Sequence, residues 1–157
     1  MIRSFSNTST SVRICKEVPN GSTALDIAKS ISEGLARKVL AAEINGEVWD
    51  ATRAIDKDAT LKLLTWDDKG GQSTFWHSSA HLMAEAIESM FPGVKFWVGP
   101  PVENGFYYDV DLADYSITEE DLRKLEVKMA ELAKKNSAYI RKPIAKADAV
   151  AYFTEKG

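Results

Sequence analysis

The sequence predicts an α+β fold in two units, and three observations support this. Residues 1–66 contain short apolar segments with the period of strands and one helical pattern. Residues 67–73 are polar and contain paired glycines, which is typical of a connection. Residues 74–157 carry long helical patterns around an aromatic segment. Of the 157 residues, 45% are hydrophobic and 27% are charged, a composition typical of folded globular proteins.

The first unit has the element order strand, helix, hairpin and strand. Thr23 is the expected N-cap of the helix, and Asn45-Gly46 is the expected turn of the hairpin. A sheet of this order with one helix packed across it favours a β-grasp domain. The predicted elements are strands 11–15, 39–44, 47–49 and 61–65 and helix 24–31.

The second unit is predicted to alternate helices with short strands. Ser73 or Thr74 is the expected N-cap of its first helix, and Thr118 with Asp121 resembles a capping box before the next one. Proline and glycine at residues 91–93 end the first helix. The predicted elements are helices from 73 or 74 to 90, 118–135 and 147–153, and strands 94–98, 106–110 and 139–144.

Charge and cysteine content narrow the functional classes. The formal net charge of −3 gives no global signature of nucleic-acid binding. Cys15 is the single cysteine, so an internal disulfide is impossible. No run of about 20 apolar residues suggests a membrane span, and no secretory signal opens the sequence. We expect a cytoplasmic protein without a membrane partner.

The two histidines of the chain, His77 and His81, lie four residues apart in the first helix of the second unit. This spacing places both imidazoles on one helix face, where they can bind one metal ion or orient one water molecule. A histidine pair that only makes structural hydrogen bonds has the same spacing. His77 and His81 are the only candidate metal ligands that we identify in the sequence. A zinc site needs three or four protein ligands, so we expect no stable metal site in this chain.

An aromatic segment, residues 99–111, is the second candidate for a functional role. Tyr107 and Tyr108 are neighbours in a predicted strand, so their side chains should face opposite sides. One of them can then point into a pocket, while a simple packed hairpin explains the same residues.

Three stretches together resemble the N-terminal region of bacterial threonyl-tRNA synthetase. They are Trp66-Asp67-Asp68, the block at residues 75–86 with His77-Ser78-Ser79-Ala80-His81, and the block at residues 99–111. The resemblance implies a TGS domain of β-grasp fold at residues 1–66 and a linker at 67–73. It also implies that residues 74–157 are the first part of a truncated editing domain of the threonyl/alanyl-tRNA synthetase type.

The resemblance also implies a function. The parent enzyme joins threonine to its tRNA with ATP, and its editing domain hydrolyses seryl-tRNA formed by mistake. His77, His81 and Tyr108 are then editing-site residues, with the histidines positioning the water or the terminal ribose. A later Lys, an Asp and a Cys-x-x-x-His pair complete the site in that family and are not in this sequence, so the fragment alone is expected to be inactive.

Cofactors and partners follow from the same resemblance. ATP, Mg²⁺ and Zn²⁺ are expected for the synthetase core outside this sequence, and none is expected in the fragment. The partner is threonine tRNA, and the parent is expected to be a homodimer through domains outside this sequence.

Two other functions stay open at this stage. One is a freestanding hydrolase that edits aminoacyl-tRNA in trans, since alanyl-type editing proteins share an HxxxH…CxxxH pattern. The other is a non-catalytic TGS-type module that binds RNA or a regulatory ligand.

Overall fold

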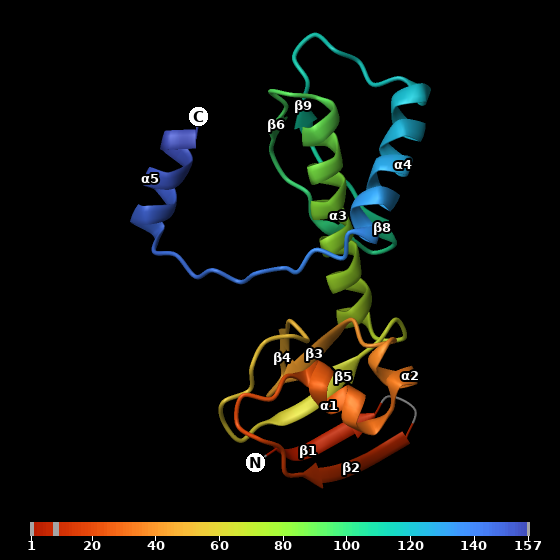
Figure 1. Cartoon of the computed structure of the whole chain (residues 1–157), viewed down its shortest axis with the longest axis vertical. Helices are drawn as coiled ribbons and strands as arrows, with labels where there is room; N and C mark the ends of the chain where they lie inside the picture. The colour runs from red at the N-terminus through yellow and green to blue at the C-terminus, as the bar shows by residue number, and fades with distance from the viewer. Residues whose placement is uncertain (1, 8–9, 157) are drawn as a thin grey trace.

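The computed structural model describes residues 2–7 and 10–156, with side chains described for residues 17–155. A small sheet domain occupies one end of the molecule, and the long helix α3 (Lys69–Met90) leads from it into the second unit (Figure 1). Helix α4 (Glu119–Lys134) lies beside the upper half of α3, and helix α5 (Lys146–Lys156) stands apart at the end of an extended segment. No helix among the described residues is long and apolar enough to cross a membrane.

The first unit contains a five-stranded sheet of order β2-β1-β5-β3-β4. Strands β1 and β5 are parallel, and the other neighbours are antiparallel. The α+β class is thereby confirmed, and the sheet has the β-grasp arrangement expected from the sequence. The elements are β1 (Ile2–Asn7), β2 (Thr10–Lys16), α1 (Ala24–Ile31), α2 (Glu33–Ala36), β3 (Ala41–Ile44), β4 (Glu47–Trp49) and β5 (Thr60–Leu64).

Strand β1, like the short helix α2, is an element of this domain that the sequence pattern did not predict. Its pairing with β2 shifts register between Ile2 and Phe5 and again between Ser6 and Asn7. Such irregularities break the two-residue period from which strands are recognised. Parallel pairing with β5 holds β1 in the sheet, although the sequence of β1 lacks a clear strand pattern.

Local sequence explains the turns of this domain. Thr23 caps α1 in a capping box with Asp26, as the two side chains accept each other's backbone N–H groups. The predicted turn between β3 and β4 has positive φ at both central residues, 52° at Asn45 and 89° at Gly46. Asn and Gly tolerate this conformation best, so the pair fixes the hairpin.

The core of the first unit lies between the sheet and α1. Leu63 on the central strand β5 is 1% exposed and packs with Ile27, Ile44 and Leu61. Leu61 and Leu63 are two positions apart on β5 and therefore lie on the same face of the sheet, in the core with the helix.

Replacing Leu63 with alanine should lower the free energy of unfolding by about 3 kcal/mol, because the sheet cannot close the cavity that remains. Urea unfolding measures the change. Leu122→Ala is the matched control, since Leu122 on α4 is 50% exposed. It should change stability by no more than about 0.5 kcal/mol. Equal effects of the two variants would contradict the assignment of Leu63 to the core.

The second unit is held together by the contact between α3 and α4. Ala86 and Ile87 of α3 pack against Leu125 and Leu132 of α4, and partly buried side chains surround them. Helix α3 ends at Met90 before the Phe91-Pro92-Gly93 stop, as predicted, and Gly93 has a φ of 86°. Helix α4 begins after the predicted cap Thr118.

The predicted aromatic hairpin is present but interrupted. Strand β6 (Lys95–Phe96) pairs with β9 (Val110–Asp111), and β7 (Pro101–Val102) pairs with β8 (Gly105–Phe106) inside it. The continuous return strand predicted at 106–110 is therefore wrong. Pro100 and Pro101 have no N–H to donate, so the ladder breaks between the two short pairs.

The strand predicted at residues 139–144 is also absent from the structure. The segment is extended but pairs with no strand among the described residues. Ile140 is 88% exposed and Ile144 is 51% exposed. An apolar pattern supplies a strand only where a neighbouring strand accepts its hydrogen bonds.

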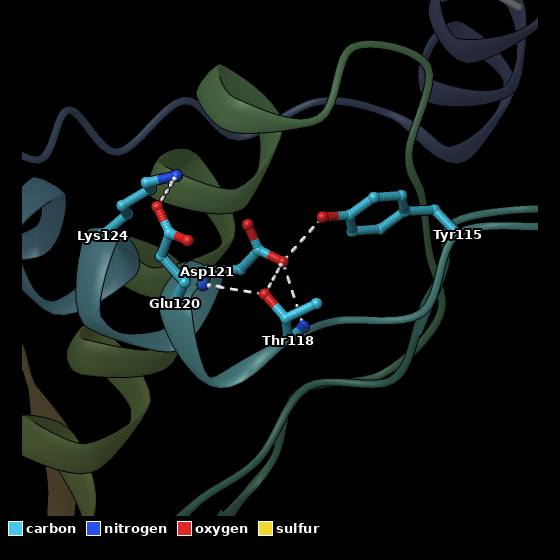
Figure 2. A network of polar contacts seen from close by, with 5 residues as sticks. All are labelled: Tyr115, Thr118, Glu120, Asp121 and Lys124. Atoms are coloured by element: carbon cyan, nitrogen blue, oxygen red, sulfur yellow. Dashed lines mark hydrogen bonds and ion pairs between the residues drawn. The ribbon is translucent and has the colours of Figure 1, made fainter.

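A polar network anchors the start of α4 (Figure 2). One carboxylate oxygen of Asp121 accepts hydrogen bonds from the Tyr115 hydroxyl at 2.7 Å, the Thr118 hydroxyl at 2.6 Å and the Thr118 N–H at 3.0 Å. These bonds, led by the Thr118 hydroxyl, lower the pKa of Asp121 to about 2. The network therefore favours the ionised carboxylate in the folded state.

This network should make folding sensitive to acid. The folded pKa of Asp121 is about 2 and the ordinary value is 3.8, so its contribution is complete above pH 3.8 and disappears as pH falls toward 2. Thermal melts between pH 5 and pH 2 should show a shallower acid loss for Asp121→Asn than for the wild type. The exposed Asp114→Asn serves as control and should follow the wild type. Parallel curves for Asp121→Asn and the wild type would contradict the role of the network.

Candidate functional site

The long helix α3 presents His77 and His81 on one face, as their spacing predicted. Their rings stack with centroids 4.8 Å apart and planes at 26°. Both side chains are on the exposed side of the helix, whereas Ala80 between them is fully buried. The α3 backbone thus places two imidazoles side by side without any loop residue.

The start of α3 differs from the prediction. The helix begins at Lys69, so most of the segment predicted as a linker (67–73) is helical and neither Ser73 nor Thr74 is the N-cap. Gly71 is buried, and a Cβ at this position would collide with the carbonyl oxygen of Thr65. The paired glycines therefore allow close packing of the helix on the end of β5.

Polar contacts fasten this junction. Asp68 holds Lys62 in an ion pair at 2.8 Å and accepts the Thr65 N–H at 3.0 Å. The Gln72 side-chain amide donates to the Trp66 carbonyl at 2.8 Å. The Trp66 ring also meets Phe75 and Trp76 edge-on, each at 5.3 Å between centroids. The first turns of α3 are thus tied to the β-grasp domain.

Both imidazoles line a cavity of about 410 Å³ between the β-grasp domain and α3. This volume lies within the range of small-molecule sites. The cavity, which we call the histidine cavity, has residues of both units in its wall. They are Leu40, Val48, Trp49, Asp50, Ser73, Thr74, His77, Ser78, His81 and Tyr139.

The surroundings of His81 favour its neutral form. Partial burial lowers the pKa of His81 below its ordinary value of 6.5, and the neighbouring His77 lowers it further. A neutral imidazole keeps one nitrogen lone pair free to accept a proton near pH 7. His81 can therefore act as a hydrogen-bond acceptor or general base toward a water or a hydroxyl group.

Tyr139 is a site residue that sequence reasoning did not identify. Its hydroxyl donates to the Ser78 carbonyl, between the two histidines, at 3.2 Å. Burial and the charge of Glu85 raise the pKa of Tyr139. It lines the histidine cavity and also an adjacent cavity of about 390 Å³ between α3 and the end of α4. The local sequence around Tyr139 does not identify it as a site residue, because its hydrogen bond to Ser78 joins residues 61 positions apart.

Tyr108, the third predicted site residue, lies elsewhere in the second unit. Its ring packs over Gly99, where a Cβ would collide with it, and meets Phe96 edge-on at 5.3 Å. It is not among the described residues that line the histidine cavity. The structure thus brings His77 and His81 together but does not bring Tyr108 to them.

The described residues contain no group of three or more histidine, cysteine, aspartate or glutamate side chains that could hold a metal ion. Two stacked imidazoles form half of a typical zinc ligand set. The side chains that line the histidine cavity can transfer protons and form hydrogen bonds.

Comparison with known proteins identifies the class of the first unit. Residues 13–65 match the family model of the TGS domain, in agreement with the β-grasp sheet. Residues 13–65 therefore have the sequence of a TGS domain.

The rest of the comparison extends over nearly the whole chain. The chain is 60% identical over 141 residues to the threonine–tRNA ligase of Cytophaga hutchinsonii and 54% identical over 142 residues to that of Parabacteroides distasonis. The ligase of Flavobacterium psychrophilum is 44% identical over 140 residues. These matches cover 89–90% of the chain but 22% of each relative, so the chain spans about a fifth of their length. The resemblance to threonyl-tRNA synthetase is confirmed.

Proposed function

We propose that this chain is the N-terminal part of a threonine–tRNA ligase, which charges threonine tRNA using ATP. The observation that carries the proposal is 60% identity over 141 residues to a protein of that name. The partner is threonine tRNA, and the cellular location is the cytoplasm, where translation occurs. Homodimer contacts and the sites for ATP, Mg²⁺ and Zn²⁺ then belong to parts of the parent enzyme beyond these residues.

The second unit begins the editing domain in this proposal, and the histidine cavity is part of its active site. Serine differs from threonine by one methyl group, which a binding pocket discriminates by only about 10- to 200-fold. A separate hydrolytic site that admits serine and excludes threonine supplies the missing accuracy. The stacked imidazoles support this role because they can orient and deprotonate a water or hydroxyl beside an ester.

Tyr108 has a different role in this proposal from the one that the resemblance implies. Its ring packs on Gly99 and Phe96, which supports a part in shaping the second unit. The site is completed by groups further along the parent chain, so the 157-residue chain alone should hydrolyse seryl-tRNA poorly.

The complete gene product tests the proposal. Its intact mass in the source cell should be several times the 17.4 kDa of this chain. The purified product should attach threonine to threonine tRNA with ATP and should hydrolyse seryl-tRNA in preference to threonyl-tRNA. A product of about this size that performs neither reaction would contradict the proposal and favour a binding module.

A further inference from the structure

Positive charge is concentrated in one part of the chain, residues 134–146, which we call the basic segment. Its cations are Lys134, Lys135, Arg141, Lys142 and Lys146. No aspartate or glutamate lies between Glu131 and Asp148, although the chain as a whole has a formal net charge of −3. The positive charge is therefore local, and a local run of one sign attracts ligands of the opposite sign.

The cations of the basic segment lack the carboxylate partners that the cations of α4 have. On α4, Arg123 pairs with Glu119 at 3.2 Å. The next residue, Lys124, pairs with Glu120 at 2.7 Å. Among residues 17–155, whose side chains the structure describes, no ion pair joins a carboxylate to a cation of the basic segment. Its charges are thus available to a ligand, whereas those of α4 are balanced within the helix.

The backbone of the basic segment is also accessible. The segment leaves the end of α4 and runs in an extended conformation toward α5 (Figure 1), and every residue in it is exposed. The backbone of residues 137–144 makes no hydrogen bond with any other described residue. The Tyr139 hydroxyl donates to the Ser78 carbonyl at 3.2 Å, which attaches the middle of the segment to α3.

These features fit the backbone of a nucleic acid. Lysine and arginine side chains and free backbone N–H groups are the donors that contact phosphate oxygens. RNA carries one negative charge per phosphate, and cations that neutralise these charges release counterions. The interior of a membrane suits the segment less well, because its extended backbone would lose its hydrogen bonds to water there.

We propose that the basic segment is a surface that binds the phosphate backbone of RNA. The inference rests on the proposed function, because threonine tRNA is then the RNA that reaches this surface. Phosphates carry no sequence information, so the segment adds affinity and orients the tRNA without selecting it. Arg141 and Lys142 are the cations next to the Tyr139 attachment and are the first to test.

The experiment is a titration of the full 157-residue chain into a fluorescently labelled transcript of threonine tRNA at several KCl concentrations, followed by fluorescence anisotropy. The double variant Arg141→Gln/Lys142→Gln should weaken binding about tenfold. It should also reduce the slope of log Kd against log[KCl] by about 1 for each cation lost. A transcript of phenylalanine tRNA should show the same fold-change, because only phosphates are contacted.

Arg123→Gln/Lys124→Gln is the matched control. It removes the same two residue types and the same charge from α4, where both cations already have carboxylate partners. This variant should change the affinity less than about twofold. Both pairs of side chains are exposed, so equal melting temperatures of the wild type and the two variants show that any loss of affinity is not a folding defect.

The outcomes separate the inference from the proposed function. Equal loss in the two double variants, or loss in neither, would contradict the role of the basic segment. A loss confined to threonine tRNA would show that bases are read and would overturn the phosphate contact. Failure of the chain to bind either tRNA would contradict the inference. In that case, binding to vesicles of phosphatidylserine and phosphatidylcholine would identify the ligand as an anionic membrane.

The proposed function has its own readout, the attachment of threonine to tRNA by the complete gene product. A product that charges threonine tRNA although the double variant binds RNA normally leaves the proposed function intact and removes the inference. A product that does not charge it, while the double variant loses affinity for both transcripts, contradicts the proposed function and leaves the RNA surface in place.

Discussion

Replacing His81 with alanine in the complete gene product is expected to slow hydrolysis of seryl-tRNA about 100-fold or more, the usual contribution of a positioned general base. The same substitution should leave the attachment of threonine to tRNA unchanged, because the proposed function assigns that reaction to parts of the parent enzyme beyond these residues. Single-turnover hydrolysis of seryl-tRNA, with charging measured in parallel, checks both expectations.

The pH profile adds a second readout to this prediction. Partial burial and the neighbouring His77 lower the pKa of His81 below its ordinary value of 6.5, so the neutral base predominates at pH 7 and is lost as pH falls through that pKa. Hydrolysis by the wild type should therefore decline in mild acid, and the residual activity of His81→Ala should not follow that decline. Glu88→Gln is a control on the same helix, since Glu88 is exposed and does not line the histidine cavity. If His81→Ala hydrolysed seryl-tRNA at the wild-type rate, the proposed role of the His81 imidazole would be contradicted.

Replacing Gly71 with alanine should lower the free energy of unfolding by about 2–3 kcal/mol, which corresponds to a fall in Tm of about 5–10 °C. The added Cβ would overlap the backbone carbonyl of Thr65, which cannot move aside as a flexible side chain would. The first turn of α3 would have to lift from β5, so the NMR signals of the two histidine rings should also shift.

Gly34→Ala is the matched control for this substitution. Gly34 lies in the short helix α2, and a Cβ there would meet nothing within 4 Å. Alanine has the higher helix propensity, so this variant should be neutral or gain up to about 1 kcal/mol. Thermal and urea unfolding of the two variants decide the question. A Gly71→Ala protein as stable as the wild type would show that the junction is loose.

Prediction from the sequence succeeded where the signal is local. Thr23 with Asp26 and Thr118 with Asp121 form the expected capping boxes, because a cap depends on residues three positions apart. Asn45-Gly46 forms the expected hairpin turn for the same reason. The position of the His77 and His81 side chains on the same face of α3 follows from helix geometry alone.

Prediction from the sequence failed where the local structure depends on contacts between residues that are far apart in the chain. Gly70 and Gly71 have the composition of a linker, yet they are helical because β5 packs directly against them. Strand β1 is ordered by its pairing with β5, more than 50 positions away in the chain. Residues 139–144 have a strand pattern but no partner strand among the described residues.

The sequence by itself determined the α+β class, the helix caps, the β3–β4 turn and the imidazole pair on one face of α3, because each depends on neighbours within a turn or a hairpin. Only the tertiary structure decided that Trp49 and Asp50 share a cavity with that pair, and that Tyr139 bonds to Ser78 while Tyr108 packs on Gly99. The physical reason is that a site wall is set by the packing of whole elements. Here the close approach of α3 to β5 at Gly71 sets how the two units meet, and no local pattern encodes that approach.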